Sequence, residues 1–222
     1  MKQLLLDISR PVPPRLDSFV SGSNRELLQA LQNACTGKSK ERVFYLWGEA
    51  GSGKSHLLQA CAAQLDGAFY VSCDAATQLD EALVRHRLLA IDDVHRLDEA
   101  EQIALFNLFN EFNAGTGMLI VSGPAAPAAL SIRRDLATRL GSGLVFQVHR
   151  LDDAEKRAAL TNRAAELGFF LSEESTTYLL THWRRDLASL LSMLMAVDRH
   201  SLQSHRTVTL TLIKEVMALP TN

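Results

Sequence analysis

The chain has 222 residues, of which 47% are hydrophobic and 22% are charged, and its formal net charge is -2. This composition predicts a globular protein with a sizeable core, and it excludes a disordered chain and a protein that is basic throughout in order to coat nucleic acid. Cys35, Cys61 and Cys73 lack C-x-x-C spacing, so we interpret them as reduced thiols of a cytoplasmic protein, not as a disulfide frame or zinc site.

The N-terminal residues 1–15 differ from the rest of the chain. An apolar run at residues 3–8 is followed by Pro11, Pro13 and Pro14, which keep the backbone extended. Such a segment can dock in the groove of a partner, or it can pack on its own domain as an arm or an edge strand. The residues by themselves favour the second interpretation.

A first helix is predicted from Ser23, as an N-cap with Glu26 three residues later, to about Cys35. The apolar residues 43–47 then predict a buried strand. No apolar run reaches the length of a membrane-spanning helix, and the N-terminus has no signal-peptide core.

Residues 48–55 read Gly-Glu-Ala-Gly-Ser-Gly-Lys-Ser and match the phosphate-loop pattern G-x-x-x-x-G-K-S between a predicted strand and a predicted helix. The glycines let successive N–H groups point at phosphate oxygens. Lys54 is expected to reach the β- and γ-phosphates, and the hydroxyl of Ser55 is expected to hold Mg²⁺. A glycine-rich surface turn is the alternative, which the agreement of strand, loop and helix disfavours.

Four further apolar runs, at residues 68–71, 88–93, 118–122 and 144–148, alternate with helical stretches that include 79–84 and 101–113. They complete a predicted five-stranded parallel sheet that is covered on both faces.

The third predicted strand ends in Asp92 and Asp93, at the sheet edge where α/β proteins bind ligands. Asp92 is predicted to hold Mg²⁺ directly or through water. Asp93 is placed where a general base or a water-positioning group is needed.

After Leu151 the pattern becomes helical. Asp152 is predicted to cap one helix, Ser172 to cap a second, and a short extended piece at 207–210 to precede a last helix. We therefore predict three parts: an arm at 1–15, a nucleotide-binding α/β domain at 16–150 and a small all-helical domain at 151–222.

The chain resembles the AAA+ ATPases of the DnaA clade over nearly its whole length. The similar segments, in chain order, are residues 16–24, 46–58, 92–93, 108–110, 135–144 and 185–187. The resemblance implies an AAA+ P-loop NTPase core with a helical lid, and bound ADP or ATP with Mg²⁺. It implies nucleotide contacts from Phe19, Val20, Asn24, Gly48, Ala50, Gly51, Ser52, Gly53, Lys54, Ser55, His56, Asp92 and Arg185.

Four of these contacts have specific implied roles. Phe19, Val20 and Asn24 would line the adenine side, and Arg185 would reach from the lid to the phosphates. Arg139 lies in the segment that resembles the arginine finger, so it is implied to act in trans on ATP bound to a neighbouring DnaA subunit. Without this context both arginines would be interpreted as surface charge.

Two features resemble the regulatory, Hda-type branch of the clade. The chain stops after the lid, without the helix-turn-helix DNA-binding domain of an initiator. The spacing Gln-Leu-x-Leu near the N-terminus resembles a peptide that binds the sliding clamp, the β subunit of DNA polymerase III, although Asp7 stands where the branch often has Pro. The implied clamp contacts are Gln3, Leu4, Leu6 and Ile8.

The resemblance thus implies a negative regulator of chromosomal replication initiation that works in the cytoplasm at the nucleoid. With weak or no turnover of its own, it would dock on the DNA-loaded clamp and stimulate hydrolysis of ATP on DnaA, and its own nucleotide would set its homo-oligomeric state. The alternatives are an autonomous ATPase of the DnaA or helicase-loader type, and a nucleotide-dependent scaffold without catalytic effect.

Overall fold

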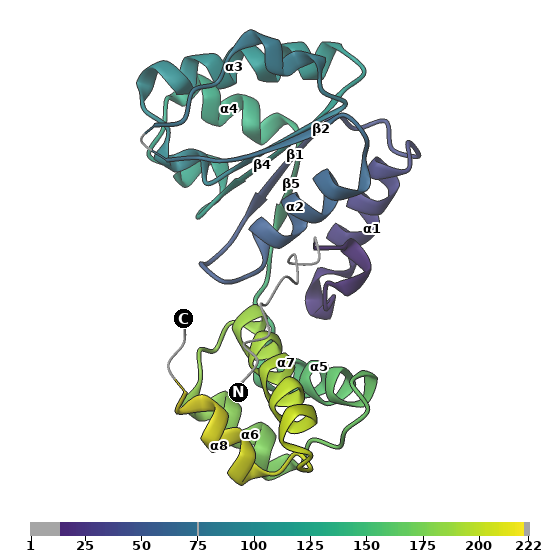
Figure 1. Cartoon of the computed structure of the whole chain (residues 1–222). Helices are drawn as coiled ribbons and strands as arrows, with labels where there is room; N and C mark the ends of the chain where they lie inside the picture. Colours follow the sequence, from purple (N-terminus) through teal and green to yellow (C-terminus); the bar gives the residue numbers. More distant parts are fainter. Residues whose placement is uncertain (1–13, 75, 220–222) are drawn as a thin grey trace, which may run out of the picture. The chain divides into compact units, whose positions relative to one another are not determined.

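The computed structural model describes residues 14–74 and 76–219, which excludes the predicted clamp contacts Gln3, Leu4, Leu6 and Ile8. The chain divides into two compact units, Met1–His149 and Arg150–Asn222 (Figure 1). We describe each unit by itself. The first is an α/β unit, and the second is helical.

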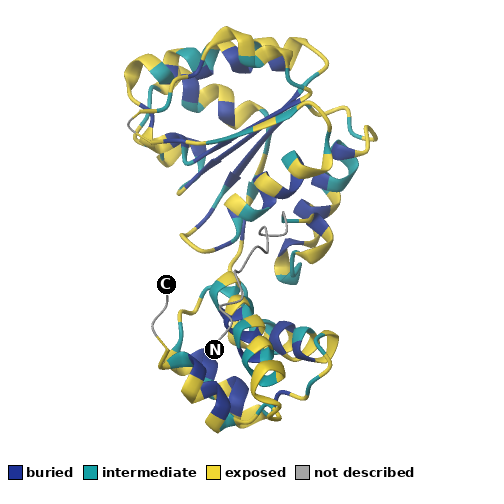
Figure 2. Cartoon of the chain, in the orientation of Figure 1, coloured by how far each residue is buried: buried dark blue, intermediate teal, exposed yellow. Residues whose placement is uncertain are grey.

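The α/β unit is built on a sheet of five parallel strands in the order β2-β3-β4-β1-β5. The central strands β3, β1 and β4 are almost entirely buried, because helices cover both of their faces (Figure 2). The predicted five-stranded parallel sheet is confirmed. The strands are β1 Val43–Trp47, β2 Ala68–Ser72, β3 Leu88–Asp92, β4 Met118–Gly123 and β5 Leu144–Gln147.

Two apolar clusters hold the helices against the sheet. Helices α1 and α2 pack on one face, and α3 and α4 pack on the other (Figure 1). Phe109 and Phe112 of α3 are buried in the second cluster, which explains the apolar stripe of that helix. The helices are α1 Arg25–Cys35, α2 Lys54–Gln64, α3 Glu99–Ala114 and α4 Arg134–Ser142.

One sequence prediction in this unit is wrong, and another is confirmed only in part. Ser23 does not cap the first helix: it lies in a 3-10 turn, Gly22–Asn24, and α1 begins at Arg25. The helical stretch predicted at 79–84 is present only as a 3-10 helix, Glu81–Arg85. Before this 3-10 helix, the N–H of Leu79 donates to the carboxylate of Glu101 at 2.6 Å.

The helical unit has its own apolar core. Asp152 and Ser172 cap their helices as predicted, and Asp152 forms a capping box with Glu155. The predicted piece at 207–210 is non-helical up to Thr209, which has extended backbone and is the N-cap of the last helix; only Leu210 differs, because it is the first residue of that helix. The helices are α5 Asp153–Glu166, α6 Glu173–His182, α7 Leu187–Ser204 and α8 Leu210–Met217.

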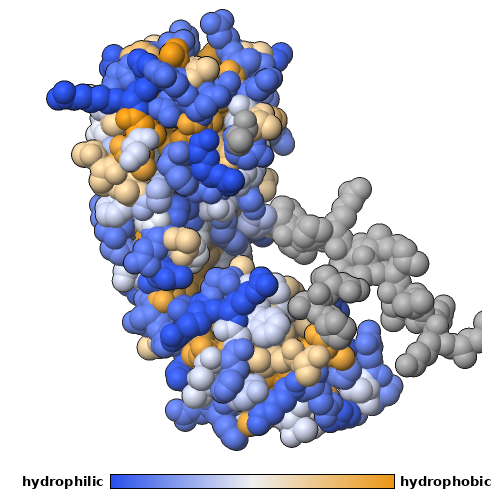
Figure 3. Space-filling view, turned by 90° about the vertical axis from the view of Figure 1, so that its left-hand side faces the viewer, coloured by the Kyte–Doolittle hydropathy of each residue, from blue (hydrophilic) through white to orange (hydrophobic). Residues whose placement is uncertain are grey.

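None of the helices within residues 14–219 combines the length and the apolar character needed to cross a bilayer. Hydrophilic residues dominate the face that is seen in Figure 3, and apolar residues appear there in small patches.

Candidate nucleotide-binding site

The loop between β1 and α2 has a backbone that requires glycine. Gly48, Gly51 and Gly53 have positive φ angles of 156°, 76° and 103°. A Cβ on Gly53 would come within 2.6 Å of the ring of Phe19, and a Cβ on Gly48 within 2.4 Å of the backbone oxygen of Val148. The loop is therefore held tightly between the N-terminal segment of the unit and the end of β5.

Lys54 is the first residue of α2 and is only 8% exposed. Its ammonium group donates to the backbone oxygens of Gly48 at 2.7 Å and Glu49 at 2.9 Å. Burial lowers the pKa of Lys54, and the negative charges of Asp93 and Asp92 oppose this shift. The lysine thus stands in the field of the two carboxylates at the end of β3, as the phosphate-loop pattern predicts.

The hydroxyl group of Ser52 indicates that the loop fits phosphate groups. Its Oγ atom is buried and has no hydrogen-bond partner within the described part of the chain. A buried hydroxyl without a partner is costly, and a phosphate oxygen would satisfy it. Together with the glycine backbone and the lysine ammonium, this hydroxyl makes the loop suited to a polyphosphate.

Asp92 is 1% exposed and is held by two hydroxyl groups. Tyr70 donates to Oδ2 at 2.9 Å, and Ser122 of β4 donates to Oδ1. The hydroxyl of Ser122 also accepts a hydrogen bond of 3.0 Å from the N–H of Asp93, whose φ is 59°. Ser122 therefore fixes the carboxylate of Asp92 and the backbone of Asp93 at the same time.

Sequence reasoning missed Tyr70 as a partner of Asp92. The register of the strands contains this contact. In the parallel pair β2 and β3, Ser72 pairs with Asp92. Tyr70 lies two residues before Ser72, so its side chain points to the same face of the sheet as that of Asp92. Within the described residues no three His, Cys, Asp or Glu side chains form a metal-binding group. The residues that fit Mg²⁺ are Ser55 and Asp92, with the remaining ligands left to phosphate and water.

The segment at residues 15–24 is anchored beside the loop. The ring of Phe19 lies 5.8 Å from that of His56, and His56 Nε2 is 3.2 Å from the backbone oxygen of Arg15. The side-chain amide of Asn24 binds both backbone groups of His149. Val20 is half-buried, and Ala50 is exposed in the loop. Their contacts with adenine stay predictions.

The two predicted arginine contacts lie in different units, Arg139 on α4 and Arg185 in the connection between α6 and α7. Arg139 is exposed on α4, with its guanidinium carbon 5.7 Å from the centre of the Phe106 ring. Arg185 belongs to the helical unit, where it donates to Asp153 at 2.7 Å. Contact of Arg139 or Arg185 with a phosphate stays a prediction.

Two family models match the chain. One, of the bacterial DnaA ATPase domain, matches residues 14–147, and the other, of the Hda lid domain, matches residues 153–217. The chain belongs to the bacterial DnaA ATPase family. It has the AAA+ fold of that family, and the helical unit is its lid domain.

Known proteins similar to this family member cover nearly its whole length. An uncharacterized protein from Haemophilus influenzae is 33% identical over 230 residues, which are 98% of this chain and 99% of that protein. Domain III of the Thermotoga maritima replication initiation protein DnaA has a TM-score of 0.74 at 18% identity, and covers 94% of this chain and 98% of that one. AMPPCP-bound DnaA from Aquifex aeolicus has a TM-score of 0.73 at 22% identity, over 89% and 68%.

Proposed function

We propose that this DnaA-family protein binds ADP or ATP with Mg²⁺ in the loop between β1 and α2. The unpartnered hydroxyl of Ser52 and the ammonium group of Lys54 support this proposal, as does the similarity to AMPPCP-bound DnaA. Ser55 and Asp92 would hold the metal, which lowers the charge of the phosphates when it is bound.

We infer further that the protein inactivates DnaA by lending it Arg139. One contrast carries this inference. Arg133, at the start of the same helix, is neutralised by Glu99 and Asp135. Arg139 forms no ion pair with any described residue and packs its guanidinium against Phe106. An exposed cation without a carboxylate partner is free to approach the γ-phosphate of a neighbouring subunit and to offset the charge that develops during transfer.

Docking on the sliding clamp through Gln3, Leu4, Leu6 and Ile8 is the second part of the proposal. These residues lie outside the described chain, so it rests on the Gln-Leu-x-Leu spacing alone. A clamp-bound regulator would be concentrated beside DnaA on the same DNA, which raises the effective concentration of Arg139.

The deciding experiment measures hydrolysis of DnaA-bound ATP in the presence of clamp-loaded DNA. We expect Arg139→Ala to abolish the stimulation, because an arginine finger contributes roughly 10³-fold or more to hydrolysis. Arg134→Ala, an exposed residue of the same helix, is the matched control and should stimulate like wild type. Gln3→Ala should lose stimulation in the assay that depends on clamp-loaded DNA, and it should keep any stimulation that occurs without the clamp. Full stimulation by Arg139→Ala would disprove the mechanism.

An autonomous ATPase is the second candidate, and the fixed position of Asp93 favours it. The αL backbone of Asp93 and its hydrogen bond to Ser122 are suited to an internal general base. Rapid turnover by the protein alone, which DnaA does not change and Asp93→Asn abolishes, would support this candidate. The regulatory proposal predicts slow turnover in the same assay.

A further inference from the structure

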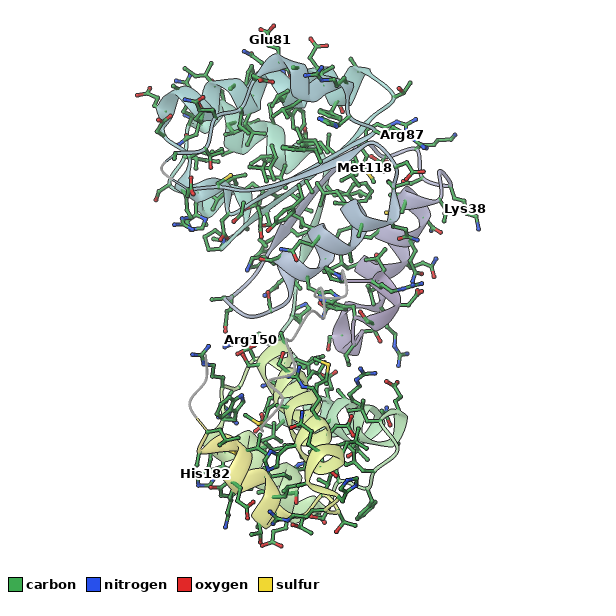
Figure 4. The ribbon with its side chains drawn as sticks, in the orientation of Figure 1. Lys38, Glu81, Arg87, Met118, Arg150 and His182 are labelled. Carbon is green, nitrogen blue, oxygen red and sulfur yellow. The ribbon has the colours of Figure 1, made fainter. Side chains whose placement is uncertain are left out.

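A second cavity lies at the amino-terminal edge of the sheet, the edge opposite the phosphate loop. It has a volume of about 500 Å³, within the range of small-molecule sites. Arg42 and Arg87 directly precede β1 and β3, and β4 begins between them. The N–H of Met118 donates to Arg87 O at 2.9 Å and that of Leu119 to Arg42 O at 2.8 Å, so both arginines border the start of β4. Figure 4 shows Arg87 and Met118 at this edge.

Three arginines are among the residues that line the cavity: Arg42, Arg85 and Arg87. None of them forms an ion pair or a side-chain hydrogen bond with residues 14–74 or 76–219. Arginines elsewhere in the chain do pair with carboxylates, as Arg133 and Arg206 show. The cavity therefore carries positive charge that the described protein does not neutralise, in the fork geometry that suits phosphate.

The other residues that line the cavity are mostly apolar. Cys35, Phe112 and Met118 form a buried apolar floor. Gly117 closes one side, where a Cβ would come within 2.7 Å of the Phe112 ring. Glu111 is the one carboxylate among the described residues that line the cavity. Since a carboxylate only accepts hydrogen bonds, it selects a ligand that presents N–H groups in addition to its negative charge.

We propose that this cavity binds a nucleoside monophosphate whose base carries an amino group. The arginines would hold the phosphate, the base would lie beside the exposed apolar side chain of Val84, and Glu111 would accept from the exocyclic amino group. The proposal does not depend on nucleotide binding in the phosphate loop, because the two sites share no residue.

Amide NMR separates the two sites. The probe is GMP, titrated into the full chain carrying Lys54→Ala, which removes the phosphate-loop lysine. We expect saturable shifts of the Gly37, Gly115 and Gly117 amides and none of the Gly51 or Gly53 amides. Arg85→Gln combined with Arg87→Gln should weaken GMP binding at least tenfold, since one charge-assisted hydrogen bond contributes about that factor. Both side chains are exposed, so this variant should fold.

The control removes the same charge elsewhere: Arg163→Gln with Arg206→Gln, in the helical unit, should bind GMP like the parent. UMP, which has no amino group, should bind more weakly than GMP, and Glu111→Gln should reduce this difference. Absence of saturable shifts at the three cavity glycines would overturn the proposal. So would unchanged binding by the double-arginine variant, or equal shifts with inorganic phosphate alone at the same concentration.

Discussion

Asn24 and His149 are joined by a pair of hydrogen bonds. The amide nitrogen of Asn24 donates to the backbone oxygen of His149 at 2.9 Å, and the N–H of His149 donates to Asn24 Oδ1 at 2.8 Å. Asn24 is 2% exposed, and His149 is the last residue of the α/β unit. One side chain thus continues the backbone pairing of the sheet beyond β5 and ties its end to the start of α1.

Asn24→Ala should lower the stability of the α/β unit by about 2 kcal/mol, because two hydrogen bonds of about 1 kcal/mol each are lost. Asn24→Asp keeps the acceptor for the N–H of His149 but sets a negative oxygen against its carbonyl. Its deficit should therefore shrink at acidic pH, where the protonated carboxyl donates again. Denaturant unfolding at pH 7 and pH 4 measures both effects. Gln29→Ala, on the exposed face of α1, is the control, and an Asn24→Ala chain as stable as that control would contradict the prediction.

The paired asparagine also shows the limit of sequence reasoning. The phosphate loop, the five strands and the caps Asp152 and Ser172 were predictable because each is written in contiguous residues with a fixed period or spacing. The contacts Asn24–His149 and Glu101–Leu79 were not, because they join segments that only the folded topology brings together.

The same limit applies within the candidate site. The phosphate-loop pattern locates Lys54 and Ser55, and two aspartates at a strand end locate the metal side. The hydroxyls that hold Asp92 come from neighbouring strands of the sheet, so their identification needs the strand order β2-β3-β4. That order cannot be derived from the residues of any single strand.

Ser122→Ala should destabilise the chain by about 2 kcal/mol, because it leaves an oxygen of Asp92 and the N–H of Asp93 without their shared partner. Ser122 is fully buried, so water does not reach this position to replace the hydrogen bonds of the missing hydroxyl. Tyr70→Phe removes one contact of Asp92 only and should cost less. Urea unfolding of both variants gives the order, and a greater loss with Tyr70→Phe would show that Ser122 does not connect the two aspartates.

Gly53→Ala should destabilise the phosphate loop, because Gly53 has a φ of 103° and an added Cβ would meet the Phe19 ring at 2.6 Å. The expected cost is about 2 kcal/mol or more. Part of it is steric, so Phe19→Leu in the same chain should recover some stability, whereas the backbone strain would remain. Thermal unfolding of the two single variants and the double variant measures this coupling. Strict additivity would show that Phe19 does not confine the loop.

Lys54→Ala should abolish the stabilisation of the protein by ADP. A ligand at a hundred times its dissociation constant stabilises the folded state by about 2.7 kcal/mol, which a thermal shift detects readily. Without ligand the variant also loses the bonds from the ammonium group to Gly48 and Glu49, so the comparison is the shift caused by ADP, not the melting temperature itself. Arg163→Ala, in the helical unit, should keep the full shift. An undiminished shift in Lys54→Ala would place the nucleotide elsewhere.

Asp186 is the N-cap of α7 and accepts a hydrogen bond of 2.8 Å from the N–H of Ser189. Burial acts to raise the pKa of Asp186, but the hydrogen bonds from Ser189 outweigh it and hold the pKa below its usual range. Because the pKa is lowered in the folded state, the ionised cap stabilises the fold fully above about pH 4, the unfolded value, and this contribution is lost as pH falls through the lowered pKa.

Asp186→Ala should therefore lower stability by about 1 kcal/mol at pH 7, the usual value of an N-cap, and the difference from wild type should decrease as the pH falls below about 4. Asp186→Asn keeps a capping oxygen without a titrating group, so its difference from Asp186→Ala should stay constant with pH. Guanidinium unfolding followed by circular dichroism from pH 7 to pH 3 tests both statements. A deficit in Asp186→Ala that grows towards low pH would mean that the carboxylate acts through a contact other than the cap.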